Sequence, residues 1–208
     1  MGGLRLDEAL WAANQDLARA CLEHRFVRGL ADGSLAAEAF RRYVAQDAFF
    51  LRAFVKAYAA ALARADDREV AAELDAFIGG ALEELKLHRA CAAELDIDLE
   101  RVAPGPACRA YTDFLLRVAW HAALSETVAA MAPCMRLYAW LGARLAGSAR
   151  PENPYRRWIE TYSSAQFQQL ADRMGALLNR VAGDIPEVRD CYRYAMQCEL
   201  DFFSEALG

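Results

Sequence analysis

In this chain of 208 residues, almost every proline lies in a short polar cluster. The stretches between these clusters are rich in Ala and Leu and contain few β-branched residues. Proline ends helices because it lacks a backbone N–H and its ring clashes with the preceding turn. Ala and Leu are strong helix formers. No strand-like alternation of apolar and polar residues runs long enough to suggest a sheet. The chain is therefore predicted to be all-α.

We predict about seven helices, several of them longer than 20 residues, as in helical bundles. They span residues 5–23, 36–64, 68–95, 106–122, 124–146, 153–182 and 186–206. The joints between them are 32–34, with Ser34 as a candidate N-cap and Glu38 near the first turn, then Asp66-Asp67, 104–106, 147–154 and 183–186. Because no internal repeat or linker divides the chain, we expect a single domain over residues 1–208.

Composition and charge argue against several classes of protein. With 56% hydrophobic and 25% charged residues and no low-complexity tract, the chain is not disordered. No uncharged run approaches the roughly 20 apolar residues of a membrane-spanning helix. The net charge of −5 argues against nucleic acid as a partner, since phosphate binding needs a basic face.

The amino-terminal segment MGGLRLDEALW carries acids and lacks the apolar region of a signal peptide. We therefore expect a cytoplasmic protein. The six cysteines are scattered and form no CxxC pair, so we expect thiols in a reducing compartment and no structural zinc.

A polar side chain on an apolar face is the informative feature of a helical protein. In the helix from residue 36, apolar residues at a three-four spacing form one stripe, and Asp47 lies in its middle with Phe50 three residues further on. A buried carboxylate is unfavourable unless it is paired or hydrogen-bonded. Asp47 is thus either a structural acid tied to a neighbouring helix or part of a site.

The last helix repeats this pattern, because Glu199 lies inside an apolar stripe and shares a face with Phe202. Two helices each place one carboxylate beside one aromatic ring. This arrangement suits a flat, nitrogen-rich ring, since aromatic side chains stack on it and a carboxylate accepts hydrogen bonds from its amino group.

Cys134 follows Pro133 inside a helical pattern, where proline is expected to kink the helix, and Tyr138 lies one turn further on the same face. A lone Cys on such a face is usually a small core residue, which describes the other five cysteines well. A Cys at a kink with a phenol in reach is a better candidate nucleophile. A nearby carboxylate would not ionise this thiol by its field, but it could take the thiol proton directly or act later as an acid.

The remaining candidates are tyrosines and histidines. Tyr111 and Tyr162 lie on helices that could border the same pocket, although each by itself reads as a core Tyr. Glu84 and His88 are four residues apart and could share a metal ion. A di-iron bundle needs several carboxylates with Glu-x-x-His motifs, and the chain has no such set. We therefore expect no metal site, and histidines that are structural or on the surface.

Six segments occur in an order that is typical of one family. They are His24-Arg25-Phe26-Val27 with 29–35, Tyr43-Val44-Ala45-Gln46-Asp47, Ala110-Tyr111 with Phe114-Leu115-Leu116, Ala132-Pro133-Cys134-Met135 with Tyr138 and Gly142, 158–164, and Glu199-Leu200-Asp201-Phe202-Phe203. On these segments the chain resembles the thiaminase II (TenA) family, in its Cys-containing branch, over nearly its whole length. The resemblance implies a heme-oxygenase-like helical fold and a homotetrameric, cofactor-free hydrolase of the thiamin pathway. Such an enzyme converts the aminomethylpyrimidine, or thiamin itself, to the hydroxymethylpyrimidine.

The resemblance also implies a role for each site residue. Cys134 would add to the pyrimidine ring, so that the exocyclic leaving group is expelled and water adds, and Glu199 would be the acid and base. Asp47 would hold the amino group and nitrogen of the ring. The aromatic members of the site would be Phe50 and Phe202 stacked on the ring, Tyr111 and Tyr138 as hydroxyl groups beside the Cys, and Tyr162 as a partner of Glu199. A Tyr is frequent in the family at the position of Phe50, so the substrate preference is left open.

Three alternatives remain at this point, since one fold carries several functions. A heme oxygenase would use a histidine such as His24 as proximal ligand, but it needs a glycine-rich distal helix, and the helix of Cys134 has only Gly142. A relative of the quinone-cofactor synthases would need a pocket rich in His and Arg. A pyrimidine-binding or regulatory protein would keep the pocket without catalysis.

Overall fold

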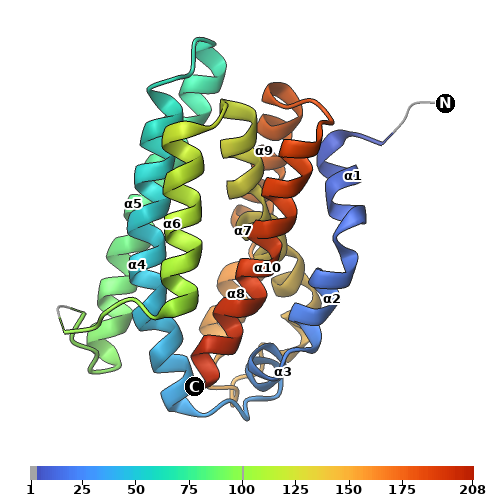
Figure 1. Ribbon diagram of the computed structural model, residues 1–208. Helices are drawn as coiled ribbons and strands as arrows, with labels where there is room; N and C mark the ends of the chain where they lie inside the picture. Colours follow the sequence, from blue (N-terminus) through green and yellow to red (C-terminus); the bar gives the residue numbers. More distant parts are fainter. Residues whose placement is uncertain (1–3, 100) are drawn as a thin grey trace.

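The computed structural model describes residues 4–99 and 101–208, and its described part consists of helices and the loops between them (Figure 1). The all-α prediction is confirmed, but the described residues form ten α-helices and one short 3-10 helix in place of the seven predicted. The helices are α1 (Leu6–Ala13), α2 (Gln15–Glu23), α3 (Arg25–Asp32), α4 (Ala37–Leu62), α5 (Arg68–Glu94), α6 (Pro106–His121), α7 (Leu124–Leu145), η1 (Ala146–Ser148), α8 (Arg156–Ser163), α9 (Ala165–Val181) and α10 (Pro186–Leu207). The first three residues of the segment MGGLRLDEALW lie outside the described range.

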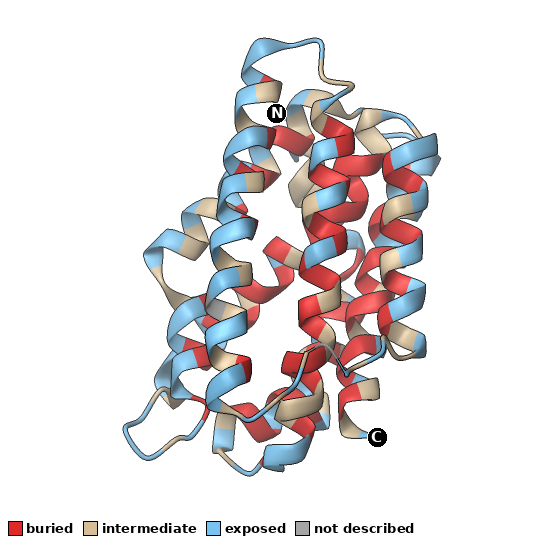
Figure 2. Ribbon diagram, turned by 90° about the vertical axis from the view of Figure 1, so that its left-hand side faces the viewer, coloured by how far each residue is buried: buried red, intermediate tan, exposed pale blue. Residues whose placement is uncertain are grey.

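The long helices pack side by side, and α10 lies in front of α7 in the view of Figure 1, between α6 and the amino-terminal helices α1 and α2. Helix α4 packs on α5 and α6, while α7 packs on α8, α9 and α10. Figure 2 shows that buried residues gather on the inward faces of the helices and exposed residues on the outward faces. The apolar stripes predicted on α4 and α10 therefore both face the interior. Asp47 of α4 and Glu199 of α10 lie within these stripes and are buried with them.

Asn14 divides the predicted helix 5–23 into α1 and α2, so this prediction of one helix is wrong. Asn14 is 3% exposed, and its Nδ2 donates a hydrogen bond to the carbonyl of Leu10 at 2.8 Å. Its Oδ1 accepts from Arg193 of α10 at 3.2 Å. An Asn side chain that bonds to nearby backbone competes with the helical pattern, and here a distant arginine holds it in that position.

Helix α3 is absent from the predicted set, and the way it ends explains why Ser34 is not an N-cap. The helix begins after His24, whose Nδ1 accepts from the backbone N–H of Phe26, and it ends at Gly33 in the left-handed region (φ 79°). The carboxylate of Asp32 then accepts from the backbone N–H of Ser34 at 2.9 Å. This turn uses Ser34, and α4 begins after Ala36 without a side-chain cap.

Other predicted joints are confirmed. Asp67 caps α5 by accepting from the backbone N–H groups of Glu69 and Val70, and Pro106 and Pro186 open α6 and α10. The predicted helix 153–182 is wrong as one element, since α8 and α9 meet at Ser164. The hydroxyl of Ser164 accepts from the backbone N–H of Phe167 at 3.2 Å, which makes it an N-cap inside an apparently continuous helical pattern.

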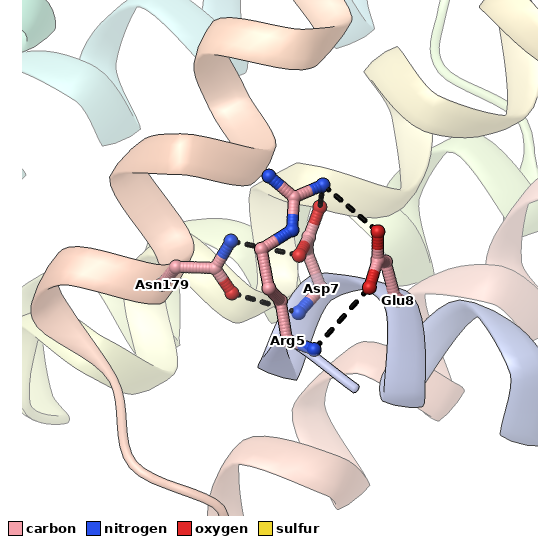
Figure 3. Close-up of polar contacts among 4 residues, drawn as sticks. All are labelled: Arg5, Asp7, Glu8 and Asn179. Carbon is pink, nitrogen blue, oxygen red and sulfur yellow. Dashed lines mark hydrogen bonds and ion pairs between the residues drawn. The ribbon is translucent and has the colours of Figure 1, made fainter. Parts of the chain in front are cut away.

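Helix α1 is tied to α9 by a reciprocal pair of hydrogen bonds (Figure 3). The backbone N–H of Asp7 donates to Oδ1 of Asn179 at 2.9 Å, and Nδ2 of Asn179 donates to the carboxylate of Asp7 at 2.7 Å. Arg5 extends this group by pairing with Glu8 at 3.1 Å. The amino-terminal helix is thus anchored to the bundle through both backbone and side chain.

No helix in the described part of the chain is both long and apolar enough to cross a membrane. All six cysteines are free thiols, as predicted.

Helix α7 approaches α8 closely at Gly142. A Cβ atom at this position would overlap the backbone carbonyl group of Tyr162 and the backbone nitrogen of Ser163. Two backbones that meet in this way leave room for glycine alone. The contact places α8, and with it Tyr162, against the part of α7 that carries Tyr138.

Replacing Gly142 by Ala is expected to push α8 away from α7 and to lower the free energy of unfolding by about 1–3 kcal/mol, the usual range for overpacking. Urea unfolding followed by circular dichroism measures the change. The matched control is Gly79→Ala on an exposed face of α5, where no atom lies within 4 Å of an added Cβ. That control should stabilise the protein by about 0.5–1 kcal/mol. Equal effects of the two variants would contradict the close packing at Gly142.

Candidate active site

Six of the eight predicted site residues line one small internal space, which we call the inner pocket. They are Asp47, Phe50, Tyr111, Tyr138, Glu199 and Phe202, and they come from α4, α6, α7 and α10. Cys134 is hydrogen-bonded to Glu199 at this place. Tyr162 lies behind Tyr138, with ring centroids 4.8 Å apart, and does not line the inner pocket.

Glu199 is the most deeply buried acid of the site, with 2% of its surface exposed. The hydroxyl of Tyr111 donates a hydrogen bond to its Oε1 at 2.8 Å. Burial raises the pKa of Glu199 to about 8, and the charge of Asp47 acts in the same direction, while the hydrogen bonds from Tyr111 and Cys134 oppose the shift. A carboxyl with such a pKa exchanges protons near neutral pH, which suits a general acid and base.

The Cys134 side chain is partly accessible, yet its surroundings keep it protonated. Burial raises the pKa of the thiol well above its usual value, and the nearby acids Glu199, Asp47 and Glu84 raise it further. A preformed thiolate is therefore disfavoured in this environment. The hydrogen bond between Cys134 and Glu199 offers a direct route for the proton, because the carboxylate can accept it as sulfur attacks.

Asp47 is 6% exposed and is paired with a residue to which the sequence assigned no role in the site. Nε2 of His88, on α5, lies 2.6 Å from Oδ2 of Asp47. Burial alone would lower the pKa of His88, but the charge and hydrogen bond of Asp47, together with the charge of Glu84, outweigh it and raise the pKa. The only signal in the sequence is the spacing of Glu84 and His88, which is compatible with a shared metal ion, although the sequence analysis favours a structural or surface histidine. Among the described residues, no group of three or more His, Cys, Asp or Glu side chains has a metal-binding arrangement.

A larger cleft of about 250 Å³, the outer cleft, lies next to the inner pocket. It is lined by Phe40, Tyr43, Val44, Glu84, His88, Cys91, Glu94, Leu95, Pro154, Arg157, Trp158, Thr161 and Tyr162. Hydrogen bonds join the walls of the two spaces, since the hydroxyl of Tyr43 donates to that of Tyr138 at 3.1 Å and accepts from Nε1 of Trp158 at 3.4 Å. Tyr43 and Trp158 appeared in the sequence only as members of a stripe and a motif.

Tyr162 has a different partner from the one that the family resemblance implies. Its hydroxyl is hydrogen-bonded to Glu84, and this bond opposes the rise in the pKa of that acid. Burial and the charge of Asp47 nevertheless raise the pKa of Glu84 to about 7. Tyr162 thus belongs to the wall of the outer cleft together with Glu84.

The rings of Phe50 and Phe202 do not form an open parallel slot in this structure. Their centroids are 6.2 Å apart and their planes are inclined by 59°. The inner pocket measures about 10 Å³, which is about the space of one water molecule. A pyrimidine that stacks on either ring therefore requires side chains of the inner pocket to move.

A comparison with known protein families shows to which family this chain belongs. Residues 11–208 match the model of the TENA/THI-4/PQQC family. The chain belongs to this family. Its resemblance to the thiaminase II group, inferred from six short segments, is confirmed.

Relatives of this chain include the aminopyrimidine aminohydrolase of Halalkalibacterium halodurans. The two sequences are 31% identical over 84% of this chain and 80% of that protein. The aminopyrimidine aminohydrolase of Bacillus subtilis is 35% identical over 72% of this chain and 65% of that protein. The bifunctional TH2 protein of Arabidopsis thaliana is 32% identical over 84% of this chain, but the chain spans only 33% of its length. The chain likewise spans 28% of the thiamine biosynthesis multifunctional protein ThiED of Corynebacterium efficiens.

Solved structures show the same fold. The TenA homologue from P. horikoshii OT3 superposes with a TM-score of 0.91 at 25% identity and covers 98% of this chain and 99% of that one. A TenA family transcription regulator from Silicibacter sp. TM1040 gives a TM-score of 0.90 at 28% identity and covers 96% and 95% of the two chains.

The raised pKa of Glu199 predicts a pH-dependent stability. A carboxyl with a folded pKa of about 8 and an ordinary value of 4.5 stabilises the fold fully below about 4.5 and loses this contribution as the pH rises to about 8. Glu199→Gln removes this titration and keeps an acceptor for Tyr111. We expect the free energy of unfolding of the variant, relative to the unmodified protein, to increase between about pH 5 and pH 8.5. Urea unfolding across this range measures it.

Glu187→Gln, an exposed acid in the first turn of the same helix, is the control for this titration. Its stability curve should follow that of the unmodified protein. Parallel curves for Glu199→Gln and Glu187→Gln would show that Glu199 does not titrate in the inner pocket.

Proposed function

We propose that this protein is an aminopyrimidine aminohydrolase of the thiaminase II type. It hydrolyses 4-amino-5-aminomethyl-2-methylpyrimidine, and thiamin, to 4-amino-5-hydroxymethyl-2-methylpyrimidine. The observation that carries this proposal is the hydrogen-bonded array of Tyr111, Glu199 and Cys134 at an aromatic pocket that also contains Asp47. Two relatives named aminopyrimidine aminohydrolase, 31% and 35% identical to this chain, support the reaction class.

In the proposed mechanism, the buried carboxylate of Asp47 accepts hydrogen bonds from the amino group of the pyrimidine and orients the ring. The sulfur of Cys134 forms a bond to a ring carbon, while the thiol proton passes through Glu199 to a ring nitrogen. Glu199 then returns that proton from the ring nitrogen to the exocyclic nitrogen, the bond between the exocyclic carbon and this nitrogen breaks, and ammonia leaves with the electron pair. Covalent addition makes this expulsion possible because the ring can supply electrons to the methylene carbon.

Water completes the proposed reaction. It adds to the exocyclic methylene carbon as Glu199 accepts one of its protons, and the bond between sulfur and ring then breaks to restore the thiol. One water molecule enters and one ammonia leaves for each turnover. Glu199 serves as base and then as acid, which its pKa of about 8 allows near neutral pH.

Replacing Cys134 by Ser is expected to lower the turnover of the aminomethylpyrimidine by at least about a hundredfold, because an alcohol is a far weaker nucleophile than a thiol. Pyrimidine binding, measured by calorimetry, should persist. Cys191→Ser, on α10 and outside both spaces of the site, is the control and should leave turnover unchanged. Unchanged turnover in Cys134→Ser would remove this residue from the mechanism.

Replacing Asp47 by Asn exchanges one acceptor oxygen for an amide donor and should mainly weaken binding. We expect the KM for the aminomethylpyrimidine to rise about tenfold or more, with a smaller change in kcat. Steady-state kinetics separates these effects, with Asp113→Asn on the exposed side of α6 as control. Normal affinity would contradict the role of Asp47 on the amino group.

A non-catalytic, pyrimidine-binding regulator is the second candidate, because a solved relative at 28% identity is described as a transcription regulator. Side-by-side assays of the aminomethylpyrimidine and thiamin, with ammonia and hydroxymethylpyrimidine both quantified, distinguish the two. Faster release from the aminomethylpyrimidine would identify salvage as the main activity. Stoichiometric binding without product would favour the regulator.

We further propose that the chain acts as one domain in a cytoplasmic homotetramer, as the family resemblance implies. Large apolar side chains on the surface support an interface: Trp120 of α6 is 64% exposed and Tyr194 of α10 is 47% exposed. Light scattering coupled to gel filtration measures the oligomeric state.

A further inference from the structure

His88 contacts the carboxylate proposed to hold the substrate, although it does not line the inner pocket. Its Nε2 lies 2.6 Å from Oδ2 of Asp47. We propose that His88 is a positioning residue that fixes the carboxylate of Asp47 through an Nε2–H···Oδ2 hydrogen bond and leaves Oδ1 as the acceptor for the aminopyrimidine. This inference rests on the proposed function, because it assigns His88 to the substrate affinity of the same site.

The pair joins two helices across the boundary between the two spaces of the site. Asp47 comes from α4 and lines the inner pocket, whereas His88 comes from α5 and lines the outer cleft. Their side chains are only 9% and 15% exposed. Hydrogen bonds between ionised partners are short and strong, and removal of one partner leaves the other as an uncompensated buried charge. The orientation of Asp47 therefore depends on a residue of the neighbouring helix.

The other nitrogen of His88 distinguishes this residue from a structural histidine. Nδ1 is buried and has no hydrogen-bond partner among the described residues. In contrast, His24 accepts from the backbone of Phe26 with Nδ1 and faces the hydroxyl of Ser204 with Nε2 at 3.2 Å. Buried polar atoms are nearly always satisfied when their role is only to stabilise the fold. The His88 ring has one polar anchor, and this anchor is Asp47.

The surroundings of His88 favour its charged form. On its own helix it faces Glu84, and Asp47 approaches it from α4. Arg157 and Tyr162 of α8 and Cys91 and Glu94 of α5 line the same cleft further out. The charge and hydrogen bond of Asp47 raise the pKa of His88 despite its burial. An imidazolium here cannot accept a proton at Nε2, so this nitrogen donates to Asp47.

Two variants of His88 test the inference by steady-state kinetics on the aminomethylpyrimidine. His88→Leu removes the donor, and we expect its KM to rise about tenfold to a hundredfold with a smaller loss in kcat, the effect of losing a hydrogen bond to a charged group. His88→Gln places an amide N–H near the position of Nε2 and should restore the KM to within about threefold of the unmodified protein. The control is His121→Leu, at the exposed end of α6, with unchanged kinetics expected.

The outcomes separate the inference from the function on which it rests. No turnover by the unmodified protein overturns the proposed function. Normal turnover with an unchanged KM in His88→Leu overturns the inference about His88 alone, and so does an equal rise in KM in His88→Leu and His88→Gln.

A second measurement does not require that the leucine variant folds. Nitrogen-15 NMR of the histidine side chains gives the titration midpoint of His88, which we expect above its usual value in the unmodified protein and lower in Asp47→Asn. His121, on α6, serves as an internal reference in the same spectra. A His88 midpoint that is the same with and without the Asp47 carboxylate would overturn the pairing.

Discussion

Two carboxyl groups of this protein are buried among aromatic rings, and their need for partners dictates which helices must meet. Asp47 and Glu199 are 6% and 2% exposed, and an unpaired charge at such a depth is strongly unfavourable. The two acids meet this requirement differently. Glu199 keeps its proton to a pKa of about 8 and is hydrogen-bonded to Tyr111 and Cys134, whereas Asp47 is paired with His88. Helices α4, α5, α6, α7 and α10 must therefore meet at one place.

The same constraint shapes the chemistry that the site supports. Burial, together with the nearby acids, raises the pKa of the Cys134 thiol, so the nucleophile that we propose depends on a proton acceptor at the moment of attack. In the proposed mechanism the acceptor is Glu199, which is hydrogen-bonded to the thiol and, with a pKa of about 8, is partly ionised near neutral pH. The inner pocket is small and its rings are inclined, so substrate entry and ring stacking are coupled to side-chain movement. Tyr43, in the wall of the outer cleft, is hydrogen-bonded to Tyr138 of the inner pocket, so the walls of the two spaces are joined.

The sequence predicted the helical class, the joints at Asp67, Pro106 and Pro186, and the burial of Asp47 and Glu199. These features depend on local physics: proline and capping residues act within one turn, and a stripe of apolar residues determines which face of a helix is buried. The breaks at Asn14 and Ser164 were missed because both residues lie within patterns that are compatible with a continuous helix. At Asn14 an arginine of α10, distant in the sequence, completes the hydrogen bonds that hold the break.

The same contrast between local and long-range effects applies to the candidate site. The acid and thiol side chains of the candidate site could be predicted from the sequence, because an acid or a thiol on an apolar stripe is recognisable without knowing its neighbours. The packing of the helices sets the pairs, which could not be predicted: His88 with Asp47, Tyr111 with Glu199 and Tyr162 with Glu84. Each pair joins different helices, and the angle and offset at which two helices pack are set by the whole interface. Hydrogen bonds act over about 3 Å, so a small change in that packing would select different partners.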